Sequence, residues 1–373
     1  MRGFAILVVV LFHIYMKTHF VFAGSLFGWQ FDAHTFVEAG YLGVEIFFFV
    51  SGFCLMLPFA VWLVGRRPKQ TWPEYVSRRF WKIVPSYYLA LAVVVFFYPF
   101  QAQPGIAPAT DALLHAVFLH GFNALSFSSL NAGYWSLAVE VEFYVVFPLL
   151  VWGFARSPIV ATVATTLLGL GYSWYIAAHD LDGVFQFAYQ LPSFLPLFAI
   201  GGLCAWVHER WIRGATLART TQLELGVVAL ASVAALAYVF EQANRGGGGP
   251  ASWGWENGHR LEIAVVLAAF TLAAACATPF AQACIANRPL AFLSDISYNM
   301  YLWNGAIIDW MGRHWTPNAW WAPTVPFSAL AFVLTVLFGW AITRAFERPL
   351  MRARFEPILR LFRRRPPSTT TAP

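Results

Sequence analysis

The feature that most constrains this chain is a series of long apolar stretches separated by short polar connections. A run of about 20 apolar residues can cross the hydrocarbon core of a bilayer as an α-helix. Ten such stretches occur, at residues 4–22, 41–63, 84–100, 134–154, 159–178, 187–207, 223–240, 262–280, 290–312 and 325–346. Backbone groups in lipid must be hydrogen-bonded internally, and the alternation of a β-barrel is absent. The sequence therefore predicts an all-α polytopic membrane protein with about ten transmembrane helices.

Composition excludes the main soluble classes. Of the 373 residues, 59% are hydrophobic and 11% are charged, whereas soluble domains have about 45–50% apolar and about 25% charged residues. A water-soluble globular domain, a disordered chain and a nucleic-acid-binding protein are therefore not expected. The four cysteines lie inside apolar runs without a C-x-x-C motif. We expect them to be small buried hydrophobic residues, with no disulfide and no metal site.

The basic residues orient the predicted helices. Cytoplasmic loops carry an excess of Lys and Arg. With a cytoplasmic N-terminus, twenty of the 24 Lys and Arg residues fall on the cytoplasmic side. Both termini are therefore expected in the cytoplasm, and residues 350–373 read as a basic, partly disordered cytoplasmic tail. Segments 99–133 and 241–260 are expected outside, and the short stretch 112–122 is expected to be an interfacial or re-entrant helix.

Ionisable residues inside apolar stretches are costly and mark candidate functional sites. His13 lies near the middle of the first stretch, eleven residues and about 16 Å after Arg2 at its cytoplasmic end. A neutral histidine can accept and return a proton, which is the role of a general base in acyl transfer to a hydroxyl. Taken alone, a histidine bonded to a neighbouring helix fits the same pattern.

Other polar residues lie at membrane depth. Glu45 is near the outer end of the second stretch, Glu140 and Glu142 follow the start of the fourth, and Asn304 is central in the ninth. Two residues on a helix that are two apart cannot share a face, so at most one of Glu140 and Glu142 should face the same cavity as His13. Interhelical hydrogen bonding is the plain alternative. Three carboxylates and a histidine fit a polar cavity better than isolated interhelical bonds.

A basic turn precedes Pro85. Arg79 and Lys82 are three residues apart and can share a surface with one ligand. Positive-inside topology with attraction to anionic lipid explains this turn from charge alone. A binding site for a phosphate-rich cytosolic molecule is the alternative, because arginine makes bidentate contacts to phosphate.

Six motifs, taken in order, resemble one family, the acyltransferase-3 group of integral membrane O-acyltransferases. They are Arg2-Gly3 with His13, GYLGVEIFFFVSGF at 40–53, RRFWKIVP at 78–85, YWSLAVEVEFYVVFPLL at 134–150, ISYNMYLWN at 296–304 and ERP at 347–349. The resemblance implies a transmembrane acyltransferase domain over residues 1–349. It also implies that an acyl group, usually acetyl, passes from cytosolic acyl-CoA to a hydroxyl at the outer face.

The resemblance also assigns expected roles. His13 would be the base, with Glu140 beside it in the catalytic set. Three cations would bind the phosphates of the acyl donor or organise the pore: Arg2, Arg79 and Lys82. The other cavity candidates are Glu45, Ser136, Glu142 and Asn304. No metal and no bound cofactor is expected, and acyl-CoA serves as co-substrate.

This chain departs from the family pattern at three of those positions. Lys82 stands where a second Arg is frequent, which keeps the charge and loses the planar fork. Glu45 replaces the more usual Asp. Asn304 replaces a frequent His, so it is not expected to carry a proton.

The leading hypothesis is therefore an O-acyltransferase, with O-acetyl transfer favoured. It would sit in a bacterial inner membrane and act on a glycan, a lipid or a small-molecule hydroxyl. The alternative is a proton-coupled transporter or flippase of a glycan, lipid or drug, with His13 and Glu140 as proton relays. Against it, WSLAVEVEFY at 135–144 has no counterpart in residues 190–346.

Overall fold

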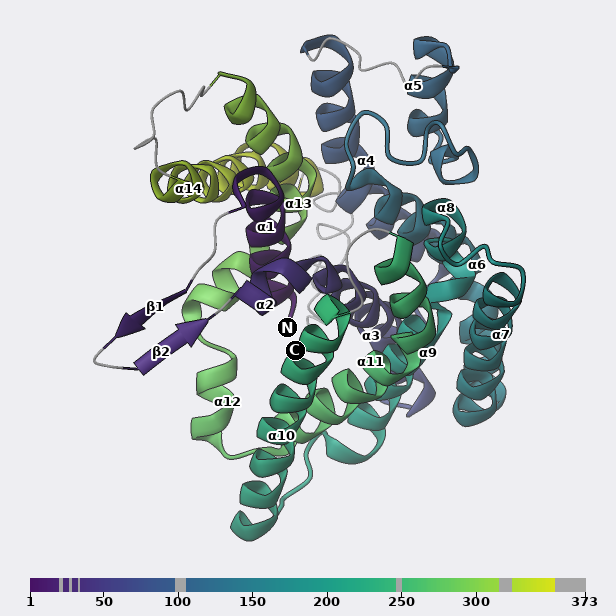
Figure 1. Cartoon of the computed structure of the whole chain (residues 1–373). Helices are drawn as coiled ribbons and strands as arrows, with labels where there is room; N and C mark the ends of the chain where they lie inside the picture. Colours follow the sequence, from purple (N-terminus) through teal and green to yellow (C-terminus); the bar gives the residue numbers. More distant parts are fainter. Residues whose placement is uncertain are drawn as a thin grey trace, which may run out of the picture.

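The computed structural model describes residues 1–19, 23–26, 29–32, 34–97, 105–245, 250–314 and 324–352. Within these residues ten long helices correspond to the ten apolar stretches (Figure 1). They are α1 (Arg2–Thr18), α3 (Gly43–Leu63), α4 (Trp72–Phe97), α6 (Tyr134–Arg156), α7 (Pro158–Ala178), α9 (Leu191–Val207), α10 (Arg219–Arg245), α11 (Pro250–Cys276), α13 (Arg288–His314) and α14 (Thr324–Ile342). The chain is thus an all-α polytopic protein. Most of the tail expected at 350–373 lies outside the described residues.

Short elements connect these helices. They are α2 (His34–Glu38), η1 (Ala39–Leu42), α5 (Pro108–Ala116), η2 (His120–Phe122), α8 (Phe185–Ala188), α12 (Pro279–Ile285) and two π-helical turns, η3 (His208–Ile212) and η4 (Thr343–Glu347). An antiparallel hairpin of β1 (Ala23–Leu26) and β2 (Trp29–Asp32) follows α1, with Ala23 opposite Asp32 and Leu26 opposite Trp29. The apolar pattern gave no sign of this hairpin.

Eight helical segments of the described chain are long and apolar enough to span a membrane. Two of the ten long helices, α1 and α13, are not among them. The first has 17 residues, and α13 includes charged and amide residues such as Asp295, Asn299 and Asp309. Both helices still pack together inside the bundle, through the close contact described below.

Two expected boundaries are wrong. Helix α4 begins at Trp72 and not near 84, and α11 begins at Pro250 and not near 262. The described parts of the segment 241–260, which are 241–245 and 250–260, are therefore helical, with Arg260 inside α11 and 1% exposed. Hydropathy averages missed these helical turns because their polar side chains find partners inside the protein or face the membrane surface.

Glycines bring pairs of helices into backbone contact. A Cβ placed on Gly52 of α3 would lie 2.2 Å from the carbonyl oxygen of Phe198 on α9. A Cβ on Gly3 of α1 would lie 2.0 Å from the carbonyl oxygen of Leu290 on α13. Such close packing through small residues is typical of membrane helices, where lipid provides no hydrophobic drive for association.

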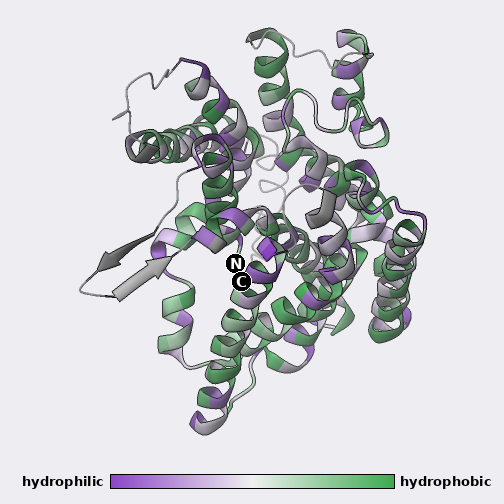
Figure 2. Ribbon diagram, viewed as in Figure 1, coloured by the Kyte–Doolittle hydropathy of each residue, from purple (hydrophilic) through white to green (hydrophobic). Residues whose placement is uncertain are grey.

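The outward faces of the helices are apolar. Leu168 and Trp174 on α7 are 65% and 72% exposed, and Leu230 on α10 is 71% exposed. Figure 2 shows hydrophobic residues predominating along these helices. Lipid is the solvent that such surfaces require.

Ion pairs join helix ends that the alternating topology puts on one side. Arg66 after α3 contacts Glu209 after α9 at 3.1 Å, and Lys17 of α1 contacts Asp309 of α13 at 3.1 Å. The first pair lies on the side that is rich in basic residues and the second lies on the opposite side.

Candidate active site

Two adjoining polar cavities lie between α1, α3, α4, α6 and α13. Four residues line both of them: Arg2, Ser51, Glu140 and Tyr298. One cavity extends toward Ser136 and Tyr301, and the other toward Arg79, Lys82, Cys54 and Tyr144. Each has a volume of about 30 Å³, which is room for about two water molecules. An acyl group would have to displace side chains or water to enter. We call the two together the polar cavity.

Glu140 of α6 faces this cavity in a fixed orientation. Its Oε1 accepts hydrogen bonds from Ser51 Oγ at 3.0 Å and from the Tyr144 hydroxyl at 2.6 Å. Glu142 lies on another face of α6, where its Oε1 would be 3.5 Å from a Cβ on Gly121, and it does not line the polar cavity. The structure therefore separates the two carboxylates, as the helical geometry requires.

Arg2 and Arg79 bring positive charge to the cavity. The Arg2 guanidinium lies 5.9 Å from the Phe47 ring centre, and that of Arg79 lies 5.9 Å from the ring centre of Tyr144. The Nε atom of each arginine is buried and has no hydrogen-bond partner in the described part of the chain, and neither arginine forms an ion pair there. These two side chains are therefore available to an anion.

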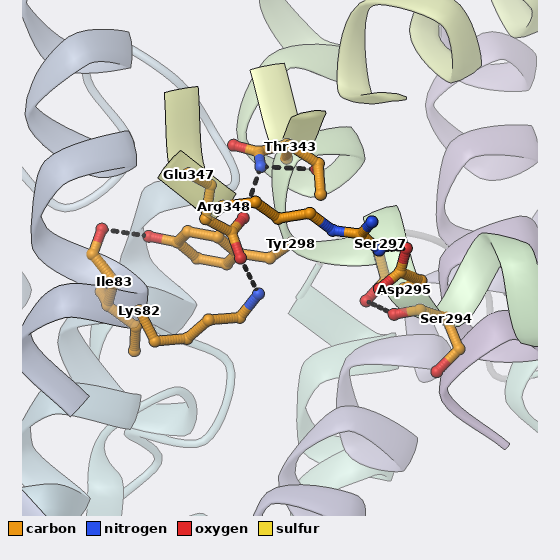
Figure 3. Close-up of polar contacts among 10 residues, drawn as sticks. Lys82, Ile83, Ser294, Asp295, Ser297, Tyr298, Thr343, Glu347 and Arg348 are labelled. Carbon is orange, nitrogen blue, oxygen red and sulfur yellow. Dashed lines mark hydrogen bonds and ion pairs between the residues drawn. The ribbon is translucent and has the colours of Figure 1, made fainter. Parts of the chain in front are cut away.

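Lys82 is different because a carboxylate already neutralises it. Its Nζ is ion-paired with Glu347 of η4. The other Glu347 oxygen accepts from Asn299 Nδ2 at 2.7 Å, and Asn299 Nδ2 also donates to Thr343 at 2.8 Å. Figure 3 shows this network, which joins the interiors of α4 and α13 to the turn η4 after α14, with the neighbouring pair of Arg348 and Asp295. Glu347 and Asn299 lie within the quoted motifs, but no feature of the sequence indicated that Glu347 pairs with Lys82 or that Asn299 donates to Glu347.

His13 lies beyond the end of the polar cavity that is farther from the basic side of the protein, which we call the outer end, and does not line the cavity. Its imidazole lies near the side chain of Asn304 on α13, and both the His13 Nδ1 and the Asn304 Oδ1 are buried without a hydrogen-bond partner among the described residues. The amide nitrogen of Asn304 donates to the carbonyls of Met300 and Tyr301, at 3.1 and 2.8 Å. Because Asn304 follows the cavity residue Tyr301 by about one helical turn, His13 lies roughly one turn outside the cavity.

A polar lid closes the cavity on this outer side. The hydroxyls of Ser136 and Tyr301 are 2.6 Å apart, and their oxygens lie 3.1 and 3.0 Å from the carbonyl oxygen of Gly133. One hydroxyl donates to the other, and the second donates to that carbonyl. Asn131 holds Gly133 in turn, because its side-chain oxygen accepts from the Gly133 amide at 3.1 Å. The loop that precedes α6 therefore covers the outer end of the cavity.

Glu45 belongs to a second buried cluster, away from the polar cavity. Its Oε1 accepts from Arg260 Nε at 3.2 Å, and both side chains are 1% exposed. Arg260 also donates to the carbonyl of Ala188 at 2.8 Å, and Glu256, four residues earlier on α11, accepts from the Tyr189 hydroxyl at 2.6 Å. The Glu256–Arg260 spacing on an apolar helix was the signal in the sequence for this cluster.

The outer segment before α6 contains a third cluster. His115 and His120, which we call the stacked histidine pair, lie with ring centres 4.0 Å apart and are fully buried. Burial lowers the pKa of His120 to about 3. Burial also lowers the pKa of His115, against the opposing effect of Asp111, whose carboxylate accepts from Ser129 at 2.8 Å. Burial thus holds the pKa of both rings below that of a free imidazole.

The four cysteines are free, but their environments differ from the expectation. Cys204 is buried, Cys276 is half-buried, and Cys54 and Cys284 are exposed. Cys54 is at the mouth of the polar cavity. Among the described residues, no group of three or more His, Cys, Asp or Glu side chains is arranged to hold a metal ion.

Comparison with known proteins places these features in a family. Residues 1–344 match the family model described as acyltransferase domain, the acyltransferase-3 model. O-acetyltransferase OatA of Staphylococcus aureus is 22% identical over 95% of this chain and 57% of its own length. The chain therefore spans little more than half the length of that relative. Exopolysaccharide production protein ExoZ of Rhizobium meliloti is 27% identical over 84% of this chain and 90% of its own length. No solved structure matches.

Proposed function

The chain belongs to the acyltransferase-3 family, and from this premise we propose that it is a membrane-embedded O-acyltransferase. It would move an acyl group, acetyl in the first place, from cytosolic acyl-CoA to a hydroxyl of an extracytoplasmic or membrane-associated acceptor. A glycan acceptor is favoured by the similarity to an exopolysaccharide production protein. Acetyl is favoured by the similarity to an O-acetyltransferase.

One observation carries this proposal. Two arginines face a cavity inside a helical membrane protein, with buried Nε atoms and no carboxylate partner in the described part of the chain. Both side chains are half-buried, and a charge that is partly removed from water is costly unless a ligand compensates it. The phosphates of coenzyme A supply that charge, and an arginine fork matches them. We therefore assign Arg2 and Arg79 to the binding of the donor's phosphates. Lys82, which lines the same cavity, adds a third cation.

The proposed reaction needs a base on the acceptor side. The acceptor hydroxyl attacks the thioester carbonyl, the carbon–sulfur bond breaks, and coenzyme A leaves as a thiolate toward the cytoplasm. His13 takes the hydroxyl proton and returns it to the thiolate, so that atoms and charge balance. Its position about one turn outside the polar cavity supports this role, because an acceptor arriving from the outer face meets His13 before Glu140. General-base help of this kind contributes about 10²- to 10⁴-fold in rate.

Glu140 is the second catalytic candidate. Ser51 and Tyr144 fix one carboxylate oxygen, and the other remains for the cavity. That oxygen would accept hydrogen bonds from the donor's polar groups and orient them. Positioning of two substrates in an enclosed site contributes about 7–11 kcal/mol to lowering a barrier.

Acyl-CoA turnover by purified protein tests the proposal. Release of free thiol from acetyl-CoA is followed for the wild type, for His13→Ala and for a matched control, His179→Ala. His179 is an exposed residue after α7 whose ring bonds to the carbonyl of Tyr175. We expect turnover in the wild type and the control and at least a hundredfold loss in His13→Ala. Equal turnover in His13→Ala would refute the assigned base. Absence of turnover with every acyl-CoA would favour the transporter.

A further inference from the structure

A cavity larger than the polar cavity adjoins it on the membrane-facing side. It is a groove of about 400 Å³ between α4 and α6. Trp72, Val76 and Phe80 of α4 form one wall. Val141, Val145 and Pro148 of α6 form the other. Its size is that of a small-molecule site, and its walls are almost entirely apolar.

The groove opens to lipid and adjoins the polar cavity. Val145 and Val76 on its rim are 74% and 61% exposed. Its floor includes Arg79, Ile83 and Tyr144, which also line the polar cavity. These three side chains therefore separate the proposed donor site from the bilayer, and the groove's occupant packs against the back of that wall.

The groove has the length of one lipid chain in one leaflet. Its α4 residues run from Trp72 to Val84, about 18 Å along a helix. One leaflet of the hydrocarbon core is about 15 Å thick. The groove starts at the basic side of the protein and ends near the membrane centre, so it fits a chain from the leaflet on the basic side.

Cations mark that end of the groove on both helices. Lys69, before α4, lies 4.9 Å and 5.1 Å from the ring centres of Trp62 and Trp72. Arg156, at the end of α6, lies 3.4 Å from that of Trp152. In the described part of the chain neither forms an ion pair. An apolar groove with free cations at the headgroup level complements an anionic amphiphile.

We propose that the groove binds one anionic phospholipid of the cytoplasmic leaflet, with an acyl chain between α4 and α6 and its phosphate beside Lys69 and Arg156. This site rests on the proposed topology of the enzyme. The bound chain closes the side of the donor site and supports Arg79 and Tyr144. The lipid is therefore a resident structural ligand and not the acceptor.

Lipid retention tests the proposal without any need for activity. Protein purified in mild detergent is analysed by native mass spectrometry for phosphatidylglycerol and phosphatidylethanolamine. The variants are Val145→Trp, which fills the groove, and Leu168→Trp, a control on the lipid-facing side of α7 where the native residue is 65% exposed. We expect wild type and Leu168→Trp to retain phosphatidylglycerol, and Val145→Trp to retain at least threefold less. Should Val145→Trp fail to fold, Val76→Trp fills the groove from the opposite wall.

A second arm tests the headgroup. The double variant Lys69→Gln with Arg156→Gln leaves the groove intact, so it should lose the preference for phosphatidylglycerol over phosphatidylethanolamine. Equal retention of the anionic lipid by wild type, groove-filled and charge variants would overturn the proposal and leave ordinary annular lipid. Lipid retention is measured without any acyl transfer. A failure here is therefore distinct from a failure of the proposed function, which turnover measures.

Discussion

Replacing Arg79 should weaken binding of the acyl donor far more than replacing its neighbour Arg78. Arg79 lines the polar cavity and its Nε has no partner in the described chain. Arg78 is exposed on another face of α4. The two residues carry the same charge one position apart, so Arg78→Gln is a matched control for Arg79→Gln.

The magnitude follows from the kind of contact. A hydrogen bond to a charged group is worth about 1.5–3 kcal/mol, which is about 10- to 150-fold in a dissociation constant. We therefore expect Arg79→Gln to raise the Kd for coenzyme A by that factor. Arg79→Lys should fall in between, because it keeps the charge and loses the bidentate fork. Lys82→Gln should have a smaller effect on binding, because Glu347 already neutralises Lys82.

Isothermal titration of coenzyme A into protein in nanodiscs of neutral lipid measures these constants. Anionic lipid at the membrane surface would interact with the basic residues and obscure the contribution of a single arginine to binding, and neutral lipid avoids this. We expect Arg78→Gln to bind within twofold of the wild type. If Arg78→Gln and Arg79→Gln weaken binding equally, general positive charge holds the donor and the geometric assignment of Arg79 is refuted.

Three further predictions concern stability. Arg260→Met should lower the free energy of unfolding by about 3–5 kcal/mol, because it leaves buried carboxylates without a cation. The thermal midpoint should fall accordingly, and adding Glu45→Gln should recover part of that fall. Burial lowers the pKa of the stacked histidine pair from 6.5, so the unfolded segment binds more protons below that pH. Acidification to pH 5 should then cost about 2 kcal/mol at His120 and speed hydrogen exchange in residues 105–133. Gly52→Ala should destabilise by about 1–3 kcal/mol through the contact with Phe198, whereas Gly171→Ala, with open space around its Cβ position, should not.

Each of these three stability predictions can be refuted by a specific result. An unchanged midpoint for Arg260→Met would mean that the cluster is hydrated or already neutral. Exchange that is independent of pH, after correction for the intrinsic rate, would mean that the histidines are not buried in the folded state. Equal effects of the two glycine substitutions would mean that the α3–α9 backbone contact is not close.

The helices could be predicted from the sequence because hydropathy is a local property. All ten apolar stretches correspond to long helices, and the helical positions of Glu140 and Glu142 follow from a spacing of two residues. The early starts of α4 and α11 could not be predicted in this way. Polar side chains such as Arg260 lower the hydropathy average whether they face water or, as here, a buried carboxylate.

The partners within the candidate site could not be predicted either. Lys82 pairs with Glu347, which lies 265 residues later, and the choice depends on how α4 and the end of α14 pack. The motifs predicted that Arg2, Arg79 and Glu140 belong to one functional site. The lid of Ser136, Tyr301 and Gly133 emerges only from the packed structure.

The central claim is that an acyl group from coenzyme A on the cytoplasmic side is transferred to a hydroxyl by way of His13. The direct measurement is transfer of radiolabelled acetyl from acetyl-CoA into membrane or glycan material, in inverted vesicles and in right-side-out vesicles. We predict incorporation in inverted vesicles that contain the wild type, none when His13→Ala replaces it, and none in right-side-out vesicles. Incorporation that is equal for wild type and His13→Ala, or that occurs from the opposite face, would contradict the account.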